Sequence, residues 1–586
     1  MKAFLIILFT SFTLCCYSQE IMPKKTNISR NELANTIEHF ILDEIKQRKI
    51  VGLSVAIVDE EGKLMSDGFG YANKEKKDKA SSETLFPIAS ITKTFTGIAV
   101  MQLAEKGLID LDKPIGDYIE ELSLPGGEEE IITTRMLLTH HSGIQGDILY
   151  NWYLPEVSDN PLIYEQVVDL INKEGCIFPP GKMYSYSNSG YSLLGVLIHR
   201  ISGTPYVDYI RSHILEPLEM ESTIMFPGEE AENEIATGYD GKTSSTMPMK
   251  LGIPAGGMAL ASNDAVKYLQ AVINTYHGNE ILLKKTTLHQ MMISQNDSIP
   301  LDKDFSIGLS WFLQNPIKTY TKYTSHRGEL PPYHSMLVIL PELKIGVCIA
   351  TNTNDSSIPD EMAHDIIGKL YEYKTGEEIE LQNHKGQGTF DLSKMKAYEG
   401  YYPNVYFGPM DVTARRNKLL IKSSAMPMPL QLTPNADSTF SLSVNLFGFI
   451  PLPIKMLQAM KAEFRTIKNE RYLVFNIMNT LINPNIKIEP YHIPEGFIDY
   501  KGKYRLINMD NSDRIVKNVK IVKNKDFFIL KYTFLGNYKF NLALKPIDKE
   551  NAMIAGIGQF MGETIYWKTN NNNIQMHWSG LIFEKE

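Results

Sequence analysis

The spacing of apolar residues predicts regular structure from residue 28 onward. Over 28–50 the apolar positions, among them Ile37 and Ile41, recur on one helical face, which predicts an amphipathic helix. Two short apolar runs follow at 51–58 and 64–70, and the charged, glycine-containing turn between them is typical of a β-hairpin. We therefore expect a helix followed by an antiparallel strand pair.

Helical spacing returns three times downstream, over 91–106, 188–201 and 358–373, and a glycine follows each of the first two stretches as a stop signal. Strand-like runs at 335–340 and 345–351 flank a short polar turn. Strands therefore lie near both ends of this region, with helices between them. This pattern predicts an α+β fold in which helices cover an antiparallel sheet.

The pattern changes after residue 375. A polar stretch at 376–392 is the expected linker, and the chain beyond it alternates short apolar runs with turns, as antiparallel β structure does. The string Tyr398-Glu399-Gly400-Tyr401-Tyr402 is echoed 102 residues later by Tyr500-Lys501-Gly502-Lys503-Tyr504. The echo is either chance or the mark of two β-rich units of similar length. The expected domains are 28–375, 393–490 and 494–586.

Composition and charge narrow the class of protein. The 586 residues are 43% hydrophobic and 22% charged, which is the balance of a soluble globular protein and excludes a disordered chain or a disulfide-rich small protein. Lysine and arginine number 59 against 68 acidic residues, a net charge of −9. Because the chain has no overall basic field, a nucleic-acid partner is not expected.

The N-terminus has the pattern of a secretory leader. A basic residue precedes an apolar run over 3–14, and the small Ser18 follows, which is typical of a signal peptide and too short for a membrane span. We expect residues 1–18 to be removed and the protein to be exported to the bacterial periplasm or the medium. A buried N-terminal strand or helix is the alternative. Only Cys176 and Cys348 would then remain, so a disulfide framework is excluded and a single bridge stays open.

Motifs for common cofactors and metals are missing from the sequence. Gly68-Phe69-Gly70 begins like a dinucleotide loop but lacks the third glycine, and no Walker loop, His-Glu-x-x-His or Cys-x-x-Cys occurs. The adjacent His140 and His141 would point away from each other on a helix or a strand, so we interpret them as hydrogen-bonding turn residues. We therefore expect neither a cofactor nor a metal.

Ser90 and Lys93 form the first candidate catalytic pair. They open the helix over 91–106 at a spacing of three residues, which places both side chains on one face. A serine hydroxyl becomes a good nucleophile when a neighbouring base takes its proton, and burial in an apolar helix lowers the pKa of a lysine. A helix-capping serine beside a solvated lysine is the alternative interpretation.

Two further motifs place polar groups beside predicted elements. Tyr186 and Asn188 lie at the start of the helix over 188–201, and a tyrosine near cations can ionise and act as a base. Alternatively, Tyr186 packs on the core and Asn188 caps the helix. His326 and Gly328 precede the strand pair, where the glycine would let a substrate backbone lie against a strand edge. An ordinary hydrogen-bonded histidine is the alternative there.

These three motifs, Ser-x-x-Lys, Tyr-x-Asn and His-x-Gly in this order, resemble those of the penicillin-recognising serine hydrolases. The sequence is most similar to the class C β-lactamase-like branch, which includes D,D-carboxypeptidases, D-aminopeptidases and esterases. Flanking strings agree, including Leu137-Leu138-Thr139-His140-His141-Ser142-Gly143 and Pro254-Ala255-Gly256-Gly257. The resemblance covers residues 30–375 and implies a sheet flanked by helices plus an all-helical subdomain. The β-rich tail is similar to the barrel-like accessory domains of some members.

The resemblance implies a role for each matching residue. Ser90 would be the acylated nucleophile. Lys93 and Tyr186 would share the proton relay, with Tyr186 as the base. Asn188 would hold Lys93 and the substrate amide, and His326 would support Tyr186 or the substrate.

The resemblance also implies substrate contacts from Gly328 and Glu329, and an oxyanion hole formed by the backbone N–H groups of Ser90 and Glu329. His326-Arg327-Gly328 stands where β-lactamases carry Lys-Thr-Gly. A neutral histidine is a poorer anchor for a penicillin carboxylate, and Glu329 adds a negative charge. Esters and peptides with D-residues are therefore at least as good candidates as β-lactams.

The sequence thus predicts an exported serine hydrolase that cleaves an amide or ester bond in a small-molecule or peptide substrate. One alternative is a catalytically silent or weak penicillin-binding or regulatory envelope protein whose β-rich tail binds a ligand or partner. Another is a membrane-surface scaffold that uses the interrupted apolar stretch 446–460 for peripheral membrane or cell-wall contact. The substrate and the oligomeric state stay open.

Overall fold

The computed structural model describes residues 28–146, 162–225, 235–241, 243–245, 252–303, 305–314, 323–377, 392–415, 418–426, 428–435, 437–446, 450–452, 457, 460–477, 480–508, 516–524, 526–534, 538–558, 560–570 and 573–586. The predicted signal peptide at 1–18 and most of the predicted linker at 376–392 lie outside these residues, and the apolar stretch 446–460 is described only in part. Among the described residues, no helix is long and apolar enough to cross a membrane.

An eight-stranded antiparallel sheet forms the centre of the first part of the chain, in the order β3-β2-β1-β13-β12-β11-β10-β9. Its strands are β1 (Gly52–Asp59), β2 (Gly62–Asn73), β3 (Asp78–Lys79), β9 (Ser306–Ile307), β10 (Phe312–Gln314), β11 (Tyr323–Leu330), β12 (Tyr333–Leu340) and β13 (Ile345–Thr351). The predicted N-terminal hairpin is β1–β2, and the predicted strand pair is β12–β13. Because β1 pairs with β13, the two hairpins meet in the middle of one sheet.

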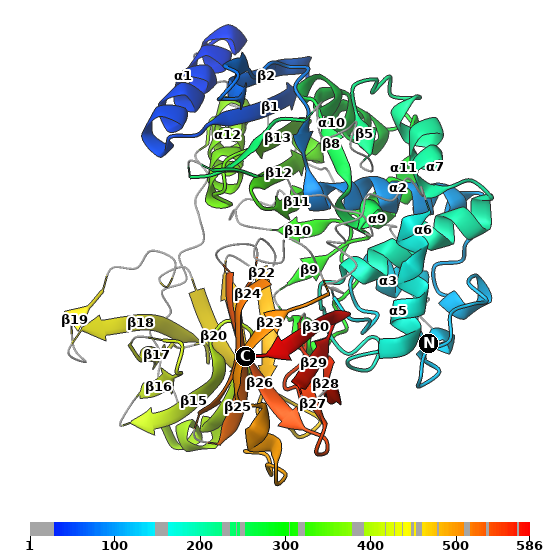
Figure 1. Ribbon diagram of the computed structural model, residues 1–586. Coiled ribbons are helices and arrows are strands. Elements are labelled where there is room, and N and C mark those ends of the chain that lie inside the picture. The colour runs from blue at the N-terminus through cyan, green and yellow to red at the C-terminus, as the bar shows by residue number, and fades with distance from the viewer. Residues whose placement is uncertain are drawn as a thin grey trace, which may run out of the picture.

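Helices cover both faces of this sheet. The α-helices in the described part of the chain, which cover the sheet or lie beside it, are α1 (Arg30–Arg48), α2 (Thr92–Glu105), α3 (Thr134–Leu138), α5 (Val167–Glu174), α6 (Asn188–Ser202), α7 (Tyr206–Ile210), α9 (Ile253–Gly256), α10 (Ser262–Tyr276), α11 (Lys285–Met291) and α12 (Ser357–Thr375). Figure 1 shows α1 and α12 together on one face, with α10 on the other. Along β13, Val347 and Ile349 pack toward α1 and α12, and the small Cys348 packs toward α10. This alternation confirms the predicted α+β layers.

The remaining helices form a helical group beside the sheet, on the right of Figure 1. The helix predicted over 91–106 begins as a 3₁₀ turn at Ala89–Ile91 and continues as α2. Short strands complete this region: β4 (Phe86–Pro87), β5 (Ile224–Met225) and β8 (Met258–Leu260) form one small sheet, and β6 (Gly238–Asp240) pairs with β7 (Thr243–Ser245). The expected sheet, flanking helices and helical subdomain are therefore all present.

The chain beyond residue 392 begins with a rolled antiparallel sheet, which we call the first barrel. Its strands are β14 (Gly400–Asn404), β15 (Gly408–Arg415), β16 (Lys418–Lys422), β17 (Leu430–Pro434), β18 (Phe440–Leu446), β19 (Ile450–Pro451), β20 (Met460–Ile467), β21 (Glu470–Ile477) and β22 (Thr480–Ile486). Ile488 N donates to Tyr401 O over 2.8 Å, which joins the first strand to the segment just after the last strand and nearly closes the barrel.

A second, fully closed barrel follows. Its strands are β23 (Gly502–Leu506), β24 (Val516–Asn524), β25 (Phe527–Phe534), β26 (Tyr538–Pro546), β27 (Asn551–Ile554), β28 (Thr564–Asn570), β29 (Asn573–Trp578) and β30 (Leu581–Lys585). Pairing of β23 with β30 closes it, and buried side chains such as Trp567, Trp578 and Phe583 fill its interior. The predicted C-terminal antiparallel β structure is confirmed, whereas the residue boundaries of the expected domains stay predictions.

The Tyr/Gly echo in the sequence corresponds to a shared local structure. In each barrel a 3₁₀ turn ends just before the first strand, and the glycine that starts that strand has a positive φ, 141° at Gly400 and 155° at Gly502, which favours glycine. The tyrosine two residues after the glycine donates its hydroxyl to the carbonyl of the tyrosine four residues before it, at 3.0 and 2.7 Å. Both barrels therefore begin with the same turn.

Candidate active site

Ser90 lies in the 3₁₀ turn that leads into α2. Its predecessor Ala89 has φ +46°, a left-handed conformation that a non-glycine residue rarely adopts and that is often found at functional sites. Both backbone polar groups of Ile88, the residue before Ala89, form hydrogen bonds. Its N–H donates to Met258 O over 3.0 Å, and its carbonyl accepts from Ser335 Oγ over 2.8 Å. The turn that carries Ser90 is therefore attached to two neighbouring strands.

The Lys93 ammonium lies at the centre of the site. The residue is completely buried, and its Nζ donates to Asn188 Oδ1 over 2.6 Å, to Ala255 O over 2.6 Å and to Ser90 Oγ over 3.2 Å. These contacts match the three donors of an ammonium group. Sequence reasoning missed the Ala255 carbonyl, since a backbone acceptor has no residue-type signal.

Tyr186 and Asn188 reach the same ammonium from the start of α6. Ser187 caps this helix, because its hydroxyl accepts from Gly190 N over 2.9 Å. The Asn188 side chain therefore does not serve as the cap, which was the alternative interpretation, and it binds Lys93 instead. The Tyr186 ring centroid lies 4.7 Å from Lys93 Nζ, within the range of a cation–π contact.

His140 and His141 are buried beside the site, and both form hydrogen bonds, as predicted, although only His140 lies within a turn. The His140 ring centroid is 4.3 Å from that of Tyr186, and its Nδ1 accepts from Ser187 N over 3.1 Å. Burial, and then the Lys93 charge, hold the pKa of His140 well below its usual range, so this ring is neutral. His141 Nε2 lies 2.6 Å from the buried Asp302 carboxylate, a contact that nothing in the sequence indicated.

His326 lies on β11 with only 2% of its surface exposed. Its Nδ1–H donates to Arg327 O over 2.8 Å, which leaves the Nε2 lone pair unprotonated. Burial is the largest cause, and the Lys93 charge the second, of a pKa lowered to about 3. Arg327 points to the opposite, exposed side, where it pairs with Asp360 at 2.9 Å and Glu329 at 3.3 Å.

Gly328 is required by the packing of β11 against the Ser90 turn. A Cβ at this position would lie 2.1 Å from Ile88 O and 2.2 Å from Ser335 Oγ, far inside contact distance. From the sequence, this glycine was expected to make room for the substrate. In the structure, its missing side chain also allows β11 to lie close to the residues before Ser90. Glu329 follows with a partly exposed carboxylate.

The structure therefore brings Ser90, Lys93, Tyr186 and Asn188 together, and it places His326 close enough for the Lys93 charge to act on it. Within the described parts of the chain, no cluster of three or more His, Cys, Asp or Glu side chains is arranged for a metal ion. The two cysteines in the part of the chain that the structure describes, Cys176 and Cys348, have free thiols.

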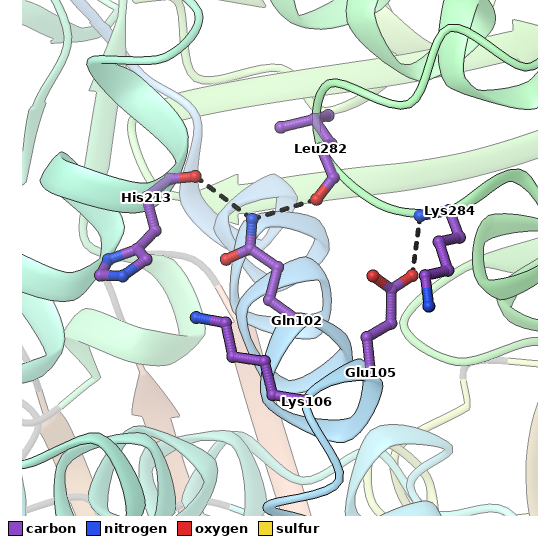
Figure 2. Close-up of a pocket in the computed structure, with 6 residues that line it drawn as sticks. All are labelled: Gln102, Glu105, Lys106, His213, Leu282 and Lys284. Atoms are coloured by element: carbon purple, nitrogen blue, oxygen red, sulfur yellow. Dashed lines mark hydrogen bonds between the residues drawn. The ribbon is translucent and has the colours of Figure 1, made fainter.

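A surface hollow of about 370 Å³ lies at the opposite end of α2 from Ser90 (Figure 2). Figure 2 shows that Gln102 donates to the carbonyls of His213 and Leu282, and that Glu105 accepts from Lys284 N. These polar groups join α2 to neighbouring segments. The hollow contains none of the residues that the motifs single out.

Comparison with known proteins identifies the family of this chain. The family model "Beta-lactamase" matches residues 35–370. Protein flp of Staphylococcus aureus strain MW2 is 27% identical over 345 residues, 58% of this chain and 66% of the relative, so the match spans just under two thirds of that protein. Penicillin-binding protein 4* of Bacillus subtilis strain 168 is 26% identical over 409 residues, 65% of this chain and 85% of the relative.

Two solved structures extend the likeness into the tail. The octameric penicillin-binding protein homologue from Pyrococcus abyssi is 26% identical, with a TM-score of 0.52 over 77% of this chain and 99% of that one. SurE is 19% identical, with a TM-score of 0.60 over 78% and 99%, and shows the fold alone. Since the family model covers more than half of the 586 residues, the chain belongs to the beta-lactamase family of serine hydrolases and penicillin-binding proteins.

Proposed function

We propose that this protein is an exported serine hydrolase that forms an acyl-enzyme on Ser90 and cleaves an amide or ester bond. The observation that carries the proposal is the 3.2 Å contact between Lys93 Nζ and Ser90 Oγ, in a chain of the beta-lactamase family. A buried cation beside a hydroxyl favours the loss of its proton. Export rests on the predicted leader at 1–18.

Lys93 and Tyr186 supply the proton path. Ser90 Oγ attacks the substrate carbonyl carbon while its proton passes to the Tyr186 phenolate, which the Lys93 ammonium stabilises. His140 and His326 are neutral, so neither competes with Lys93 as the source of that charge. Tyr186 then returns the proton to the leaving alcohol or amine. Water then attacks the acyl-enzyme ester and gives a proton to the Tyr186 phenolate. The carboxylic acid leaves, and Tyr186 returns the proton to Ser90 Oγ.

The proposed oxyanion hole uses the backbone N–H groups of Ser90 and Glu329. Its support is the close approach of β11 to the Ser90 turn, where Gly328 leaves no room for a Cβ against Ile88 O. Donors fixed in this way stabilise the charge of a tetrahedral intermediate without reorganisation, and the loss of one typically costs ~2.7–4 kcal/mol of activation free energy.

The charges along β11 favour an ester or a peptide over a β-lactam. His326 is neutral, and Arg327 is paired with Asp360 and Glu329. Along this strand, all of whose residues are described, no unpaired cation is available for a penicillin carboxylate. We therefore propose a small-molecule ester or a peptide with D-residues as the substrate class.

The test uses the mature protein, with Ser90→Ala as the loss-of-function variant and Ser212→Ala, an exposed serine on the helical group, as the matched control. Each is incubated with p-nitrophenyl acetate, nitrocefin and a D-Ala-D-Ala peptide, and turnover and intact mass are followed. We expect turnover of the ester or the peptide that disappears only in Ser90→Ala. A lasting adduct without turnover would indicate slow deacylation, as in a penicillin-binding protein. No turnover and no adduct would overturn the proposal.

A further inference from the structure

The first barrel packs directly behind the loop that carries Tyr186. Tyr472 and Val474 of β21 are buried in one apolar cluster with Phe178, Tyr184 and Phe305 of the beta-lactamase-like region. Figure 1 shows the barrels beneath the sheet, at the edge where β9 and β10 lie. The first barrel therefore packs against the loop that carries Tyr186. Because side chains in such a cluster are closely packed, this contact restricts the movement of the loop.

Arg465 of β20 makes a buried polar contact across this boundary. Only 7% of the residue is exposed. Its Nη1 donates to Leu301 O over 2.5 Å and its Nη2 to Lys303 O over 2.9 Å. Glu463, two residues earlier on the same strand face, accepts from Nε and Nη2 at 3.0 and 2.8 Å and fixes the plane of the guanidinium. Arg465 therefore binds the backbone on both sides of residue 302.

Asp302, between those two carbonyls, points into the beta-lactamase-like region. Its side chain is fully buried. One carboxylate oxygen accepts from Tyr184 N over 3.0 Å, and the other lies 2.6 Å from His141 Nε2 and accepts from Asn296 Nδ2 over 3.2 Å. A buried carboxylate with this many partners is strongly fixed in place.

The partners of Asp302 lead directly to the candidate site. Tyr184 lies two residues before Tyr186 in the same loop, and the intervening Ser185 N donates to His140 O over 2.8 Å. His140 in turn packs on the Tyr186 ring at 4.3 Å. A shift of Asp302 would therefore displace both the loop that carries Tyr186 and the histidine pair packed against it.

We propose that Arg465 is a positioning residue through which the first barrel fixes Asp302 and thereby the Tyr186 loop, so that the accessory barrel is part of the active-site framework. The inference rests on the proposed function in that Tyr186 is taken as the base. Small displacements of a catalytic group lower the rate of the chemical step far more than they weaken binding. If Arg465 has this role, its substitution should lower the rate of the chemical step while it leaves substrate or probe binding nearly unchanged.

The experiment compares full-length Arg465→Met, Arg465→Lys and Arg471→Met. Arg471 is the matched control, because it also donates to a backbone carbonyl, that of Ala397, but within the tail itself. A fluorophosphonate probe reports, by intact mass over time, the maximal rate of Ser90 acylation and the probe concentration at half-maximal rate. We expect Arg465→Met to lower the maximal rate at least tenfold with less than a twofold change in that concentration. Arg465→Lys should recover part of the loss, and Arg471→Met should stay within twofold of wild type.

A spectroscopic readout separates this inference from the proposed function. In protein labelled with ¹⁵N-histidine, the ring N–H signal of His141, assigned with His141→Gln, is expected to shift in Arg465→Met and not in Arg471→Met. If wild-type protein does not react with the probe, the proposed function fails and this signal alone decides the inference. If Arg465→Met does not fold, Asp302→Asn, which keeps the side-chain volume, must show the tenfold loss. A folded variant with wild-type rate and an unshifted His141 signal overturns the inference.

Discussion

Lys93 Nζ lies 2.6 Å from Asn188 Oδ1, although 95 residues separate the two in the sequence. The contact joins the first turn of α2 to the first turn of α6. It exists because Ser187 caps α6 and leaves the Asn188 amide oxygen for the buried ammonium. A hydrogen bond to a charged group contributes about 1.5–3 kcal/mol, so this contact is one of the strongest that fix the lysine beside Ser90.

Asn188→Ala should therefore slow the acylation of Ser90 by roughly 10- to 150-fold, which is the rate equivalent of about 1.5–3 kcal/mol. The measurement is the rate of mass gain with a fluorophosphonate probe. Asn172→Ala is a suitable control, since the Asn172 side chain also bridges two segments, to Ser123 N and Glu121 O, but lies away from Ser90. An unchanged rate in Asn188→Ala would mean that Lys93 is positioned without the amide.

A second prediction concerns stability in acid. The pKa of buried His326 is lowered to about 3, while in the unfolded chain it is near 6.5. Between these values the unfolded chain binds more protons than the folded protein, so stability falls as the pH falls through this window and is unaffected above it. From pH 7 to pH 5, His326 alone should cost about 2 kcal/mol.

Calorimetric melting at pH 7 and pH 5 tests this expectation. His326→Gln should lose less of its melting temperature over that interval than wild type, and the exposed His492→Gln should behave as wild type. His140 shifts in the same direction, so part of the acid sensitivity should persist in His326→Gln. Equal pH dependence in wild type and His326→Gln would show that His326 does not stay neutral in the folded protein.

The sequence predicted the elements more completely than the site. Apolar periodicity was sufficient for the α2 region, α6 and the β12–β13 pair because each buries one regular face. Ser90 and Lys93 were identified because their contact follows from helical spacing. The other partners in the site could not be identified from local spacing. The acceptor at Ala255 is a backbone carbonyl, and Asp302 and His141, which are in contact, lie 161 residues apart in the sequence. No local pattern encodes such contacts, since tertiary packing alone brings them together.

The second barrel contains an unfavourable pair that can be corrected. Lys520 of β24 lies directly opposite Lys531 of β25, and burial together with the Lys520 charge lowers the pKa of Lys531. Like charges directly across two strands destabilise a sheet, and opposite charges stabilise it by about 0.2–1 kcal/mol. Lys520→Glu should therefore raise the melting temperature of this barrel slightly, and less so at high salt. Lys523→Glu, opposite Phe528, should give no such gain.

The last prediction concerns the approach of β11 to the nucleophile. An alanine Cβ at position 328 would lie 2.1 Å from Ile88 O, a backbone atom that cannot rotate away. Gly328→Ala must therefore push β11 and the Ser90 turn apart, with a loss of roughly 1–3 kcal/mol of stability from overpacking and a marked loss of Ser90 labelling.

Gly368→Ala is the matched control: it lies inside α12 with nothing within 4 Å of the added Cβ, and should stabilise the helix by about 0.5–1 kcal/mol. Melting curves and probe labelling of both variants decide the matter. If Gly328→Ala kept wild-type labelling and melting temperature, the turn before Ser90 would be free to move, and the fixed oxyanion hole proposed here would lose its structural support.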